Sequence, residues 1–487
     1  MKRKIVIIGG GVIGCAAARE LSAFDADILL LDRAADVAEG ASKANSGLVH
    51  AGFDAIPGTQ KARFNVEGSR MFEALCKQLC VPYRRSGAMV LAFNKRQIDV
   101  LHALLEQGKT NGVYGLEIIG RERVLALEEH TNPAVEGALL APSAAITSPY
   151  ELTFALADHA GVNGVEFQLN TSVGKISKSN RGYCLDTSKG SIEADILLNC
   201  AGTGAGKLHN QISGRRMNIV PRKGEYYLLD HEIEPMFSHT MFQTPTEMGK
   251  GILVTPTAHD GLMLGPTALD IQDDTDVSTT ADALKQIREI TTLTWPQESL
   301  KTVVTTFAGI RAREDGGDFI VGAVDGARGA YEAIGIDSPG LSSAPAIGRY
   351  IAALIADDYQ LKRKAKQIPP LVRPKPFAEM TVDEKQQAYL QDPAYGSVVC
   401  RCEQITEAEI RAAIRRPVGA TTVDGVKRRT RAGMGRCQGG FCSPRVMEIL
   451  SEELDLKINQ ITKCGGGSRM LSNRIEEALR EMDERHE

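Results

Sequence analysis

The chain has 487 residues, of which 43% are hydrophobic and 24% are charged, with a formal net charge of −4 at pH 7. A chain of this length exceeds what one compact core supports, so two or three domains are expected. The balanced charge gives no sign of nucleic-acid binding, and no apolar run reaches the roughly 18 residues of a membrane span. The composition indicates a globular protein of several domains.

The N-terminal segment "KIVIIGGGVIGCAAARELSAFDADILLLD" has the pattern of a strand, a tight turn, a helix and a second strand. The apolar run 5–8 is typical of a parallel strand covered on both faces. Gly9, Gly11 and Gly14 form G-x-G-x-x-G, which permits the turn, the approach of a pyrophosphate and close helix–strand packing. Asp32 follows the second strand, where a carboxylate can bind ribose hydroxyls. The segment predicts a site for FAD or NAD.

The basic start and the apolar run also have features of a signal peptide. Three consecutive glycines interrupt the run, however, and an amphipathic helix pattern follows. Ten cysteines are too sparse for a secreted disulfide scaffold. We therefore expect a cytoplasmic protein, peripheral to a membrane only through a partner subunit.

Two later stretches favour FAD over NAD. Residues 194–202, "ADILLNCAG", form another apolar strand that ends in small residues, where a backbone can approach a cofactor. Residues 333–355 have the pattern of a strand, a Pro-Gly turn and a helix. The positive end of such a helix stabilises the anionic reduced flavin ring.

The stretches "NSGLVHAG", "KGEYYLLD", "AGIRAR" and "GIDSPGLSSAPA" resemble FAD-dependent oxidoreductases of the D-amino-acid-oxidase-like superfamily. Within it the chain is similar to L-2-hydroxyglutarate oxidase and FAD-dependent glycerol-3-phosphate dehydrogenase. The resemblance implies an α/β fold, in which an α+β substrate domain on an antiparallel sheet interrupts a discontinuous Rossmann-like FAD-binding domain. In the oxidoreductase domain, 1–360, the FAD-binding parts are expected at 1–85, 141–209 and 311–360, and the substrate parts at 86–140 and 210–310.

The resemblance also implies the residues of an active site. His50 is the expected base that takes the hydroxyl proton while the flavin takes a hydride. Alternatively, His50 only hydrogen-bonds the flavin or the backbone, or it forms a covalent bond to the flavin. Arg311 is expected to bind a carboxylate or phosphate, with Arg313, Lys223 and Tyr226 as further substrate-binding candidates. The expected FAD contacts are Ser42, Asn45, Ser46, Gly47, Val173, Gly202, Gly340, Leu341 and Ser342.

The C-terminal part carries four cysteines in two close pairs. Residues 361–397 are basic and proline-rich, then polar, and are expected to be a linker. Cys400 and Cys402 follow as C-x-C, and Cys437 and Cys442 as C-x4-C. A disulfide is disfavoured in a reducing compartment, and structural zinc sites usually have two-residue spacings. A [2Fe–2S] cluster binds two thiolates on each of its two irons, and two close cysteine pairs supply that arrangement, so the spacing favours such a cluster.

The surroundings of these cysteines agree with a cluster. From 410 to 445 there are nine basic residues and a single acid, and cations would stabilise the charge of a four-thiolate cluster. The same run lacks the aromatic residues of an RNA-binding patch. The pattern resembles the small helical bacterioferritin-associated-ferredoxin-like [2Fe–2S] domain, which also ends the large subunit of anaerobic glycerol-3-phosphate dehydrogenase. We expect this domain at 398–455 and a C-terminal extension at 456–487.

A one-electron centre attached to a flavin domain favours a dehydrogenase over an oxidase. The expected function is oxidation of the secondary alcohol of a small anionic substrate, with electrons passing to a flavoprotein or a quinone-linked subunit. sn-Glycerol 3-phosphate is the favoured substrate, and L-2-hydroxyglutarate or a related 2-hydroxy acid is the alternative. A non-catalytic redox module is a further alternative, and the role of Cys464 is open.

Overall fold

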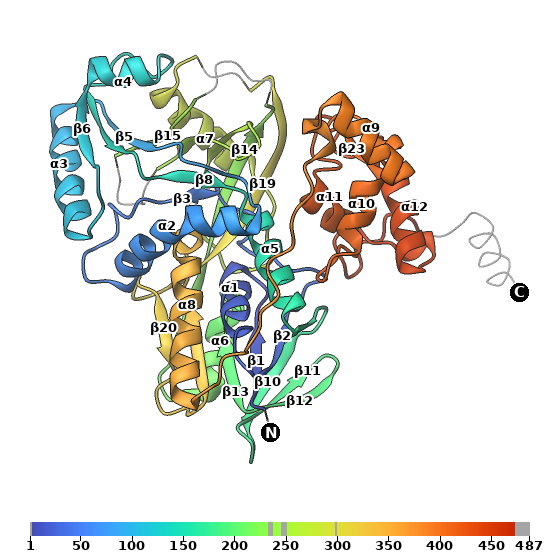
Figure 1. Cartoon of the computed structure of the whole chain (residues 1–487). Helices are drawn as coiled ribbons and strands as arrows, with labels where there is room; N and C mark the ends of the chain where they lie inside the picture. Colours follow the sequence, from blue (N-terminus) through green and yellow to red (C-terminus); the bar gives the residue numbers. More distant parts are fainter. Residues whose placement is uncertain (1, 232–236, 245–250, 298–299, 473–487) are drawn as a thin grey trace, which may run out of the picture. The chain divides into compact units, whose positions relative to one another are not determined.

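The computed structural model describes residues 2–231, 237–244, 251–297 and 300–472, which form two compact units (Figure 1). The C-terminal extension expected at 456–487 therefore lies partly outside the described residues. The expected substrate part 210–310 also includes three short stretches outside them. Unit 1 comprises Met1–Leu31, Ala38–Phe167 and Val173–Leu371, and unit 2 comprises Asp32–Val37, Gln168–Ser172 and Val372–Glu487.

A six-stranded sheet forms the centre of unit 1. Its strands are β1 (Lys4–Ile8), β2 (Asp27–Leu31), β9 (Val165–Gln168), β13 (Ile196–Asn199), β20 (Ile320–Ala323) and β21 (Ala330–Ile334). They lie in the order β20-β21-β13-β1-β2-β9, with β1 parallel to both β2 and β13. Four of the five residues of β1 are buried, as the continuous apolar run predicts.

Both faces of this sheet are covered. One face bears helices that contact one another, α1 (Val12–Leu21), α2 (Gln60–Leu79), α5 (Pro149–Val162) and α8 (Gly340–Tyr359) (Figure 1). The other bears a three-stranded sheet of β10 (Val173–Lys178), β11 (Tyr183–Thr187) and β12 (Gly190–Ala194), and α6 (Ala205–Ile212) contacts β10. Val6, Leu29 and Leu197 share a buried cluster with Tyr183 and Leu185. This arrangement confirms the expected Rossmann-like architecture.

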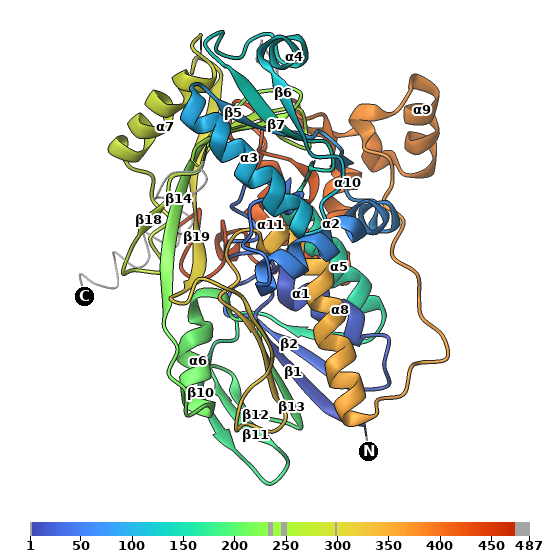
Figure 2. The ribbon, with the colours of Figure 1, turned by 90° about the vertical axis from the view of Figure 1, so that its left-hand side faces the viewer.

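A nine-stranded, largely antiparallel sheet makes up the rest of unit 1. Its strands are β5 (Ala88–Ala92), β6 (Glu117–Gly120), β7 (Gly137–Ala141), β14 (Ile219–Leu229), β15 (Thr240–Gln243), β16 (Leu253–Pro256), β17 (Leu262–Gly265), β18 (Leu269–Asp270) and β19 (Val303–Glu314). Met89 and Leu91 face one buried cluster and Val90 faces another, so the sheet is covered on both sides. The helices α3 (Lys95–Thr110), α4 (Arg121–Leu127) and α7 (Ala281–Thr294) accompany it (Figure 2).

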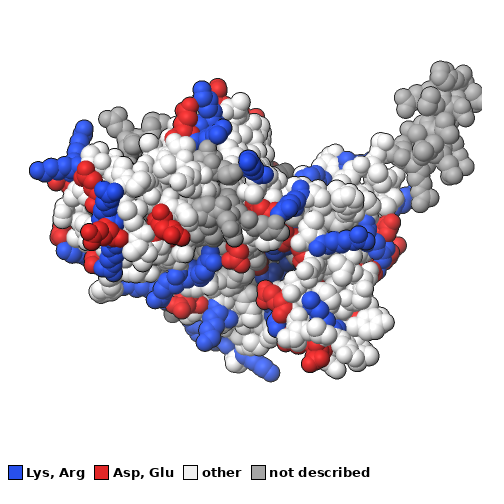
Figure 3. Space-filling model, turned by 90° about the horizontal axis from the view of Figure 1, so that it is seen from above, with Lys and Arg blue, Asp and Glu red and all other residues white. Residues whose placement is uncertain are grey.

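A small sheet of β3 (Leu48–Val49), β8 (Ala145–Thr147) and β4 (Tyr83–Arg84) completes unit 1, together with the 3-10 turn η1 (Gly202–Gly204). Among the described residues, no helix combines the length and apolar character that a membrane span requires. Lys and Arg side chains are interspersed with Asp and Glu on the face of the molecule seen in Figure 3.

Unit 2 is built mainly from short helices. Its elements are η2 (Phe377–Glu379), α9 (Val382–Gln391), η3 (Pro393–Gly396), β22 (Val398–Cys400), β23 (Ile405–Thr406), α10 (Glu407–Ile414), α11 (Val423–Thr430), α12 (Ser443–Leu454) and η4 (Ile458–Gln460). Thr381 and Thr406 begin α9 and α10 as capping boxes. Helix α9 thus lies inside the segment expected to be a linker. Ile461, in the expected extension, is buried in the core of this unit.

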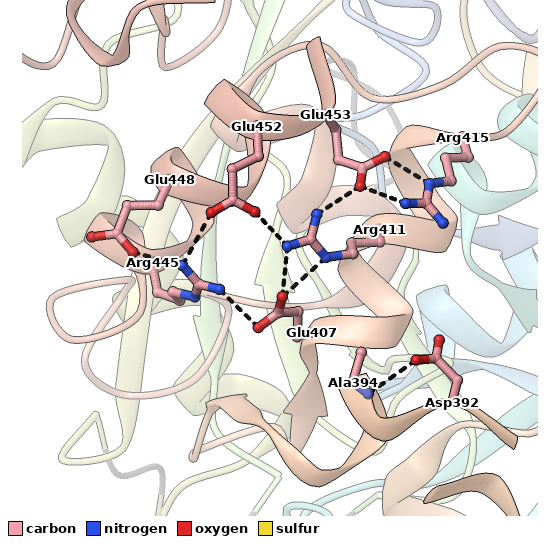
Figure 4. Close-up of polar contacts among 9 residues, drawn as sticks. All are labelled: Asp392, Ala394, Glu407, Arg411, Arg415, Arg445, Glu448, Glu452 and Glu453. Atoms are coloured by element: carbon pink, nitrogen blue, oxygen red, sulfur yellow. Dashed lines mark hydrogen bonds and ion pairs between the residues drawn. The ribbon is translucent and has the colours of Figure 1, made fainter. Parts of the chain in front are cut away.

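Charged side chains of unit 2 form two sets of ion pairs. On α10, Arg411 binds Glu407 of the same helix and Glu453 of α12, with N–O distances of 2.7 and 2.6 Å, and Figure 4 shows how these pairs connect. In the second set, the Nη2 of Arg429 on α11 donates to the Oδ1 of Asp36 at 2.7 Å. Both of the latter side chains are buried, so each charge depends on the other for stabilisation.

Candidate active site and cysteine centre

The glycine-rich turn connects β1 to α1. A Cβ at Gly9, where φ is +110°, would lie 2.3 Å from a carbonyl oxygen, and one at Gly14 would lie 1.9 Å from the Gly9 carbonyl oxygen. Gly11 is the N-cap of α1 and has only the Ser42 Oγ nearby, at 3.2 Å from such a Cβ. Two of the glycines therefore serve chain packing, and the third leaves the helix N-terminus accessible to a pyrophosphate.

A loop of residues 41–47 lies beside this helix N-terminus. The N–H of Val12 donates to the Ser42 Oγ at 2.9 Å. The Asn45 side chain closes the loop, because its Nδ2 donates to the Ser42 carbonyl and its Oδ1 accepts from the Gly47 N–H. Ser46 is half-buried between them. The structure thus brings Ser42, Asn45, Ser46 and Gly47 together in one turn, which we call the 41–47 loop.

The other expected cofactor contacts lie at the ends of elements. Val173 begins β10 and is half-buried, and Gly202 begins η1 with a φ of +57°. Gly340, Leu341 and Ser342 form the first turn of α8. A Cβ at Gly202 would meet no atom within 4 Å, so there is space for a group to approach its backbone.

Asp32 directly follows β2, as the sequence predicts. Its Oδ1 accepts a hydrogen bond from the Ala34 N–H at 2.8 Å. The residue belongs to the 32–37 segment of unit 2.

His50 directly follows β3 and is buried, with 5% of its surface exposed. Its N–H donates to the Ser342 Oγ at 2.7 Å, which ties it to the first turn of α8. Its ring lies beside those of Phe53 and Phe242, with centroids 5.9 and 5.4 Å away. The Asp54 Oδ1 lies 3.6 Å from Nδ1, and an imidazole can act as a base near neutral pH. Asp54 was not singled out from the sequence.

Strands β14 and β19 pair along their length and run side by side in Figure 2. Arg222 lies directly opposite Arg311. Because alternate residues of a strand share a face, Arg313 lies on that face too, and so does Tyr226, which stacks on Phe307 at 4.7 Å. We call this surface the arginine face.

Two glycines shape the arginine face. A Cβ at Gly224 would lie 2.7 Å from the Nη2 of Arg311, so the guanidinium extends across that position. A Cβ at Gly309 would lie 2.0 Å from the Ala44 carbonyl oxygen, so the 41–47 loop packs directly on this strand. The expected substrate-binding Arg311 therefore lies on the face of β19 that contacts the expected cofactor loop.

Lys223 does not join the arginine face. As the neighbour of Arg222 on the strand, it points to the opposite face and is buried. Its Nζ binds the Asp276 Oδ2 at 2.7 Å and the Ser278 carbonyl at 3.1 Å. These contacts indicate that Lys223 fixes the loop before α7.

The charge balance of the arginine face is positive. Arg222 binds Asp270 through two hydrogen bonds of 2.5 and 2.9 Å, and this contact holds the pKa of the Asp270 carboxyl below its usual value. Arg311 and Arg313 also act on Asp270 electrostatically. Arg311 itself donates to the Thr267 carbonyl at 2.6 Å. Three guanidinium groups thus gather beside the Asp270 carboxylate, and Asp337 also acts on Arg222 electrostatically. Such a group of cations favours binding of an anion.

The four C-terminal cysteines meet as two pairs in unit 2. The Cys402 and Cys437 sulfur atoms lie 3.9 Å apart, and the Cys442 thiol hydrogen-bonds the Cys400 sulfur. A Cβ at Gly435 would lie 2.3 Å from that of Cys402, so only glycine allows the two loops to cross there. Among the described residues, no three His, Cys, Asp or Glu side chains are grouped around one position for a metal ion. Two separate thiol pairs fit two irons better than one zinc.

Hydrogen bonds favour the thiolate form of one cysteine in each pair, Cys437 and Cys400. The hydrogen bond from the Phe441 N–H, with further N–H groups of the same loop, lowers the pKa of Cys437 below its usual value, against the effect of burial. The hydrogen bond from Cys442 lowers the pKa of Cys400 to about 6, against the effect of burial. Thiolates are the form that binds iron.

Most of the basic residues counted around the cysteines serve another purpose. Among the described residues, six of the nine pair with carboxylates, all of which lie outside the 410–445 window. The paired residues are Arg411, Arg415, Arg428, Arg429, Arg431 and Arg445. They stabilise the fold of unit 2, and the paired carboxylates offset most of the positive charge that these arginines would otherwise contribute near the cysteines. The acids were missed because they lie outside that window, for instance Glu453 on α12 and Asp36 near the N-terminus.

The sequence matches the FAD dependent oxidoreductase family over residues 4–354 and the BFD-like [2Fe-2S] binding domain over residues 398–452. The chain belongs to the FAD-dependent oxidoreductase family and carries a C-terminal [2Fe–2S]-binding domain. It is an oxidoreductase whose cofactors are FAD and a [2Fe–2S] cluster, as the sequence predicts.

Individual proteins that resemble the chain include dehydrogenases and an oxidase. Glycerol 3-phosphate dehydrogenase of Caloramator mitchellensis is 44% identical over 469 residues, which cover 96% of this chain and 98% of that protein. L-2-hydroxyglutarate dehydrogenase of Indibacter alkaliphilus is 29% identical over 277 residues, covering 55% and 68%. The structure of dithionite-reduced L-alpha-glycerophosphate oxidase from Mycoplasma pneumoniae with FAD bound has a TM-score of 0.73 and 29% identity, covering 77% of this chain and all of that one.

We predict that four cysteines, and not a fifth, hold the cluster. Replacing Cys442 by Ser should remove most of the iron and acid-labile sulfide, because a buried iron ligand is lost. Replacing Cys464, whose N–H is bound by the Ser468 side chain in an exposed turn, should leave both contents unchanged. Iron and sulfide analysis of the purified proteins checks this, and loss of iron from Cys464→Ser would contradict it.

Proposed function

We propose that the protein oxidises the secondary alcohol of sn-glycerol 3-phosphate and passes the electrons through its cluster to a separate acceptor. The observation that carries this proposal is the arginine face, where Arg222 of β14 lies opposite Arg311 of β19, the strand that packs against the 41–47 loop. The name of the relative that is 44% identical over nearly the whole chain supports the same substrate.

The arginine face suits a phosphate monoester. Directly opposed residues of an antiparallel pair have Cβ atoms about 5 Å apart, so Arg222 and Arg311 can bind oxygens of one compact dianion. A phosphate monoester carries a charge of roughly −1.5 to −2 near neutral pH, so it attracts a group of guanidinium side chains more strongly than a single carboxylate does. The two carboxylates of 2-hydroxyglutarate are separated by a carbon chain and use such a cluster less fully.

His50 is the proposed base. Its Nε2 takes the proton of the substrate hydroxyl, and the Asp54 carboxylate near Nδ1 stabilises the imidazolium that forms. The hydrogen bond from its N–H to Ser342 fixes the residue, and the two phenylalanine rings limit water around the imidazole. FAD, when bound, supplies the hydride acceptor, and the cluster supplies one-electron transfer.

The residues proposed to hold FAD follow from the geometry around α1 and α8. Gly11, with Ser42, would hold the pyrophosphate at the N-terminus of α1, while Gly9 and Gly14 allow the close packing of the turn. The rest of the 41–47 loop and the first turn of α8 would lie along the ring, and Val173 would bind the adenosine end. Tyr226 shapes the arginine face through its stacking on Phe307.

We predict that Arg222→Gln raises the KM for glycerol 3-phosphate about 10- to 100-fold with a much smaller change in kcat, since a hydrogen bond to a charged group is worth about 1.5–3 kcal/mol. The matched control is Arg84→Gln, which removes another Arg–Asp pair of unit 1 and should leave KM unchanged. Steady-state kinetics with glycerol 3-phosphate and with L-2-hydroxyglutarate measure this. A lower KM for L-2-hydroxyglutarate in the wild type would favour the 2-hydroxy-acid alternative.

We predict that His50→Asn lowers kcat by about 10²- to 10⁴-fold, the usual contribution of a general base. The wild-type rate should fall at acid pH, because a protonated imidazole cannot accept a proton, and this acid limb should vanish in the variant. His102→Asn, on the exposed surface of α3, is the control. A pH profile of kcat checks both points, and an unchanged acid limb in His50→Asn would exclude this role.

A further inference from the structure

Phe441 is the most exposed of the large apolar side chains among the described residues, with 89% of its surface accessible. It lies directly before Cys442, in the loop that carries the second cysteine pair. Leaving an aromatic ring in water forfeits the stabilisation that burial provides. Rings of this kind are typical of the centres of protein interfaces.

The position of Phe441 is set by the cysteine loop itself. Its N–H donates to the sulfur of Cys437, and the preceding turn contains Gly439 with a φ of +88°. The ring is therefore held at a defined place next to two of the four sulfur atoms, rather than at the end of a free tail.

The two cysteine pairs differ in their access to solvent. Cys400 and Cys442 are only 1% and 3% exposed, whereas Cys402 is exposed and Cys437 is half-buried. An electron leaving the cluster travels the shorter distance through the Cys402–Cys437 side. The backbone N–H of Phe441 binds Cys437, a member of this more exposed pair, and the Phe441 side chain is itself exposed.

Positive charge accompanies this exposed side. Arg401 lies between Cys400 and Cys402, Arg436 directly precedes Cys437, and both are exposed. Glu403, the acid that follows Cys402, is bound by Arg431 at 2.7 Å, so its charge is compensated. An apolar centre with a cationic rim is complementary to a protein whose own docking site has an acidic rim.

We propose that Phe441, Arg401 and Arg436 form the docking surface for an acidic one-electron carrier protein. This inference rests on the proposed electron transfer to a separate acceptor and identifies the chemistry of that partner. In each encounter the reduced cluster loses one electron and returns to its oxidised state, and the carrier gains that electron. No proton and no covalent bond are involved.

The test uses the holoprotein reduced with dithionite and freed of excess reductant, so that it does not depend on the identity of the substrate. Reduced protein is mixed with acidic cytochrome b5 or basic cytochrome c, and haem reduction is followed by absorbance. We expect faster transfer to cytochrome b5 at low salt, with a rate that falls as salt rises. Phe441→Ala and the double variant Arg401→Glu/Arg436→Glu should each slow this transfer at least about tenfold.

Control variants distinguish loss of docking from loss of the cluster or of the fold. Leu390→Ala removes another exposed apolar side chain of unit 2, on α9, and Arg349→Glu reverses an exposed charge on α8. Both should transfer electrons at the wild-type rate. Iron content and the EPR spectrum of the reduced cluster establish that each variant retains its centre, and Arg401→Gln serves if the double variant loses iron.

Three results would overturn the proposal. The first is wild-type transfer to cytochrome b5 by Phe441→Ala with an intact cluster. The second is a preference of the wild type for cytochrome c at low salt. The third is loss of substrate-driven cluster reduction in Phe441→Ala, because the ring would then serve transfer within the chain. If substrate fails to reduce the wild type while the dithionite experiment succeeds, the proposed substrate is wrong and the docking surface stands.

Discussion

The register between β14 and β19 is the constraint on which the proposed substrate site depends. Ten consecutive pairs, from Ile219–Glu314 to Leu228–Thr305, fix Arg222 opposite Arg311 and Gly224 opposite Gly309. A slip of one residue would turn the guanidinium groups to the other face. The two glycines leave room for other groups to approach the strands: Gly224 for the Arg311 side chain, and Gly309 for the 41–47 loop.

The two units differ in how their arginine side chains are paired with acids. In unit 1 an excess of guanidinium groups remains on the arginine face, which is what recognition of an anion requires. In unit 2 arginines are matched to glutamates between α10 and α12, and Arg429 to the buried Asp36. These pairs stabilise the framework around the cysteines, and Arg401 and Arg436 are exposed beside Cys402 and Cys437. Arginine therefore has a structural role in unit 2 as well as the proposed binding roles.

Local patterns were sufficient to predict the nucleotide-binding turn, the parallel strands and the cysteine pairs. The spacing of Gly9, Gly11 and Gly14 and the close spacing within each cysteine pair are short-range features that a single sequence displays. Arg222 was not among the predicted site residues, because its strand partner Arg311 lies far along the chain and pairing over that distance has no local signal. Substrate binding by Lys223 stays a prediction, although its side chain is buried on the other face of the strand from Arg222. Alternation along "RKGEYY" could have separated the two.

The most direct measurement of the central claim is an anaerobic titration of the holoprotein with sn-glycerol 3-phosphate, followed by flavin absorbance and by EPR of the cluster. The account predicts that the flavin band near 450 nm bleaches and that the signal of a reduced [2Fe–2S] cluster appears with it, in proportion to the substrate added. A flavin that stays oxidised with glycerol 3-phosphate but bleaches with L-2-hydroxyglutarate would contradict the assigned substrate. A bleached flavin beside a cluster that never becomes reduced would contradict the electron path.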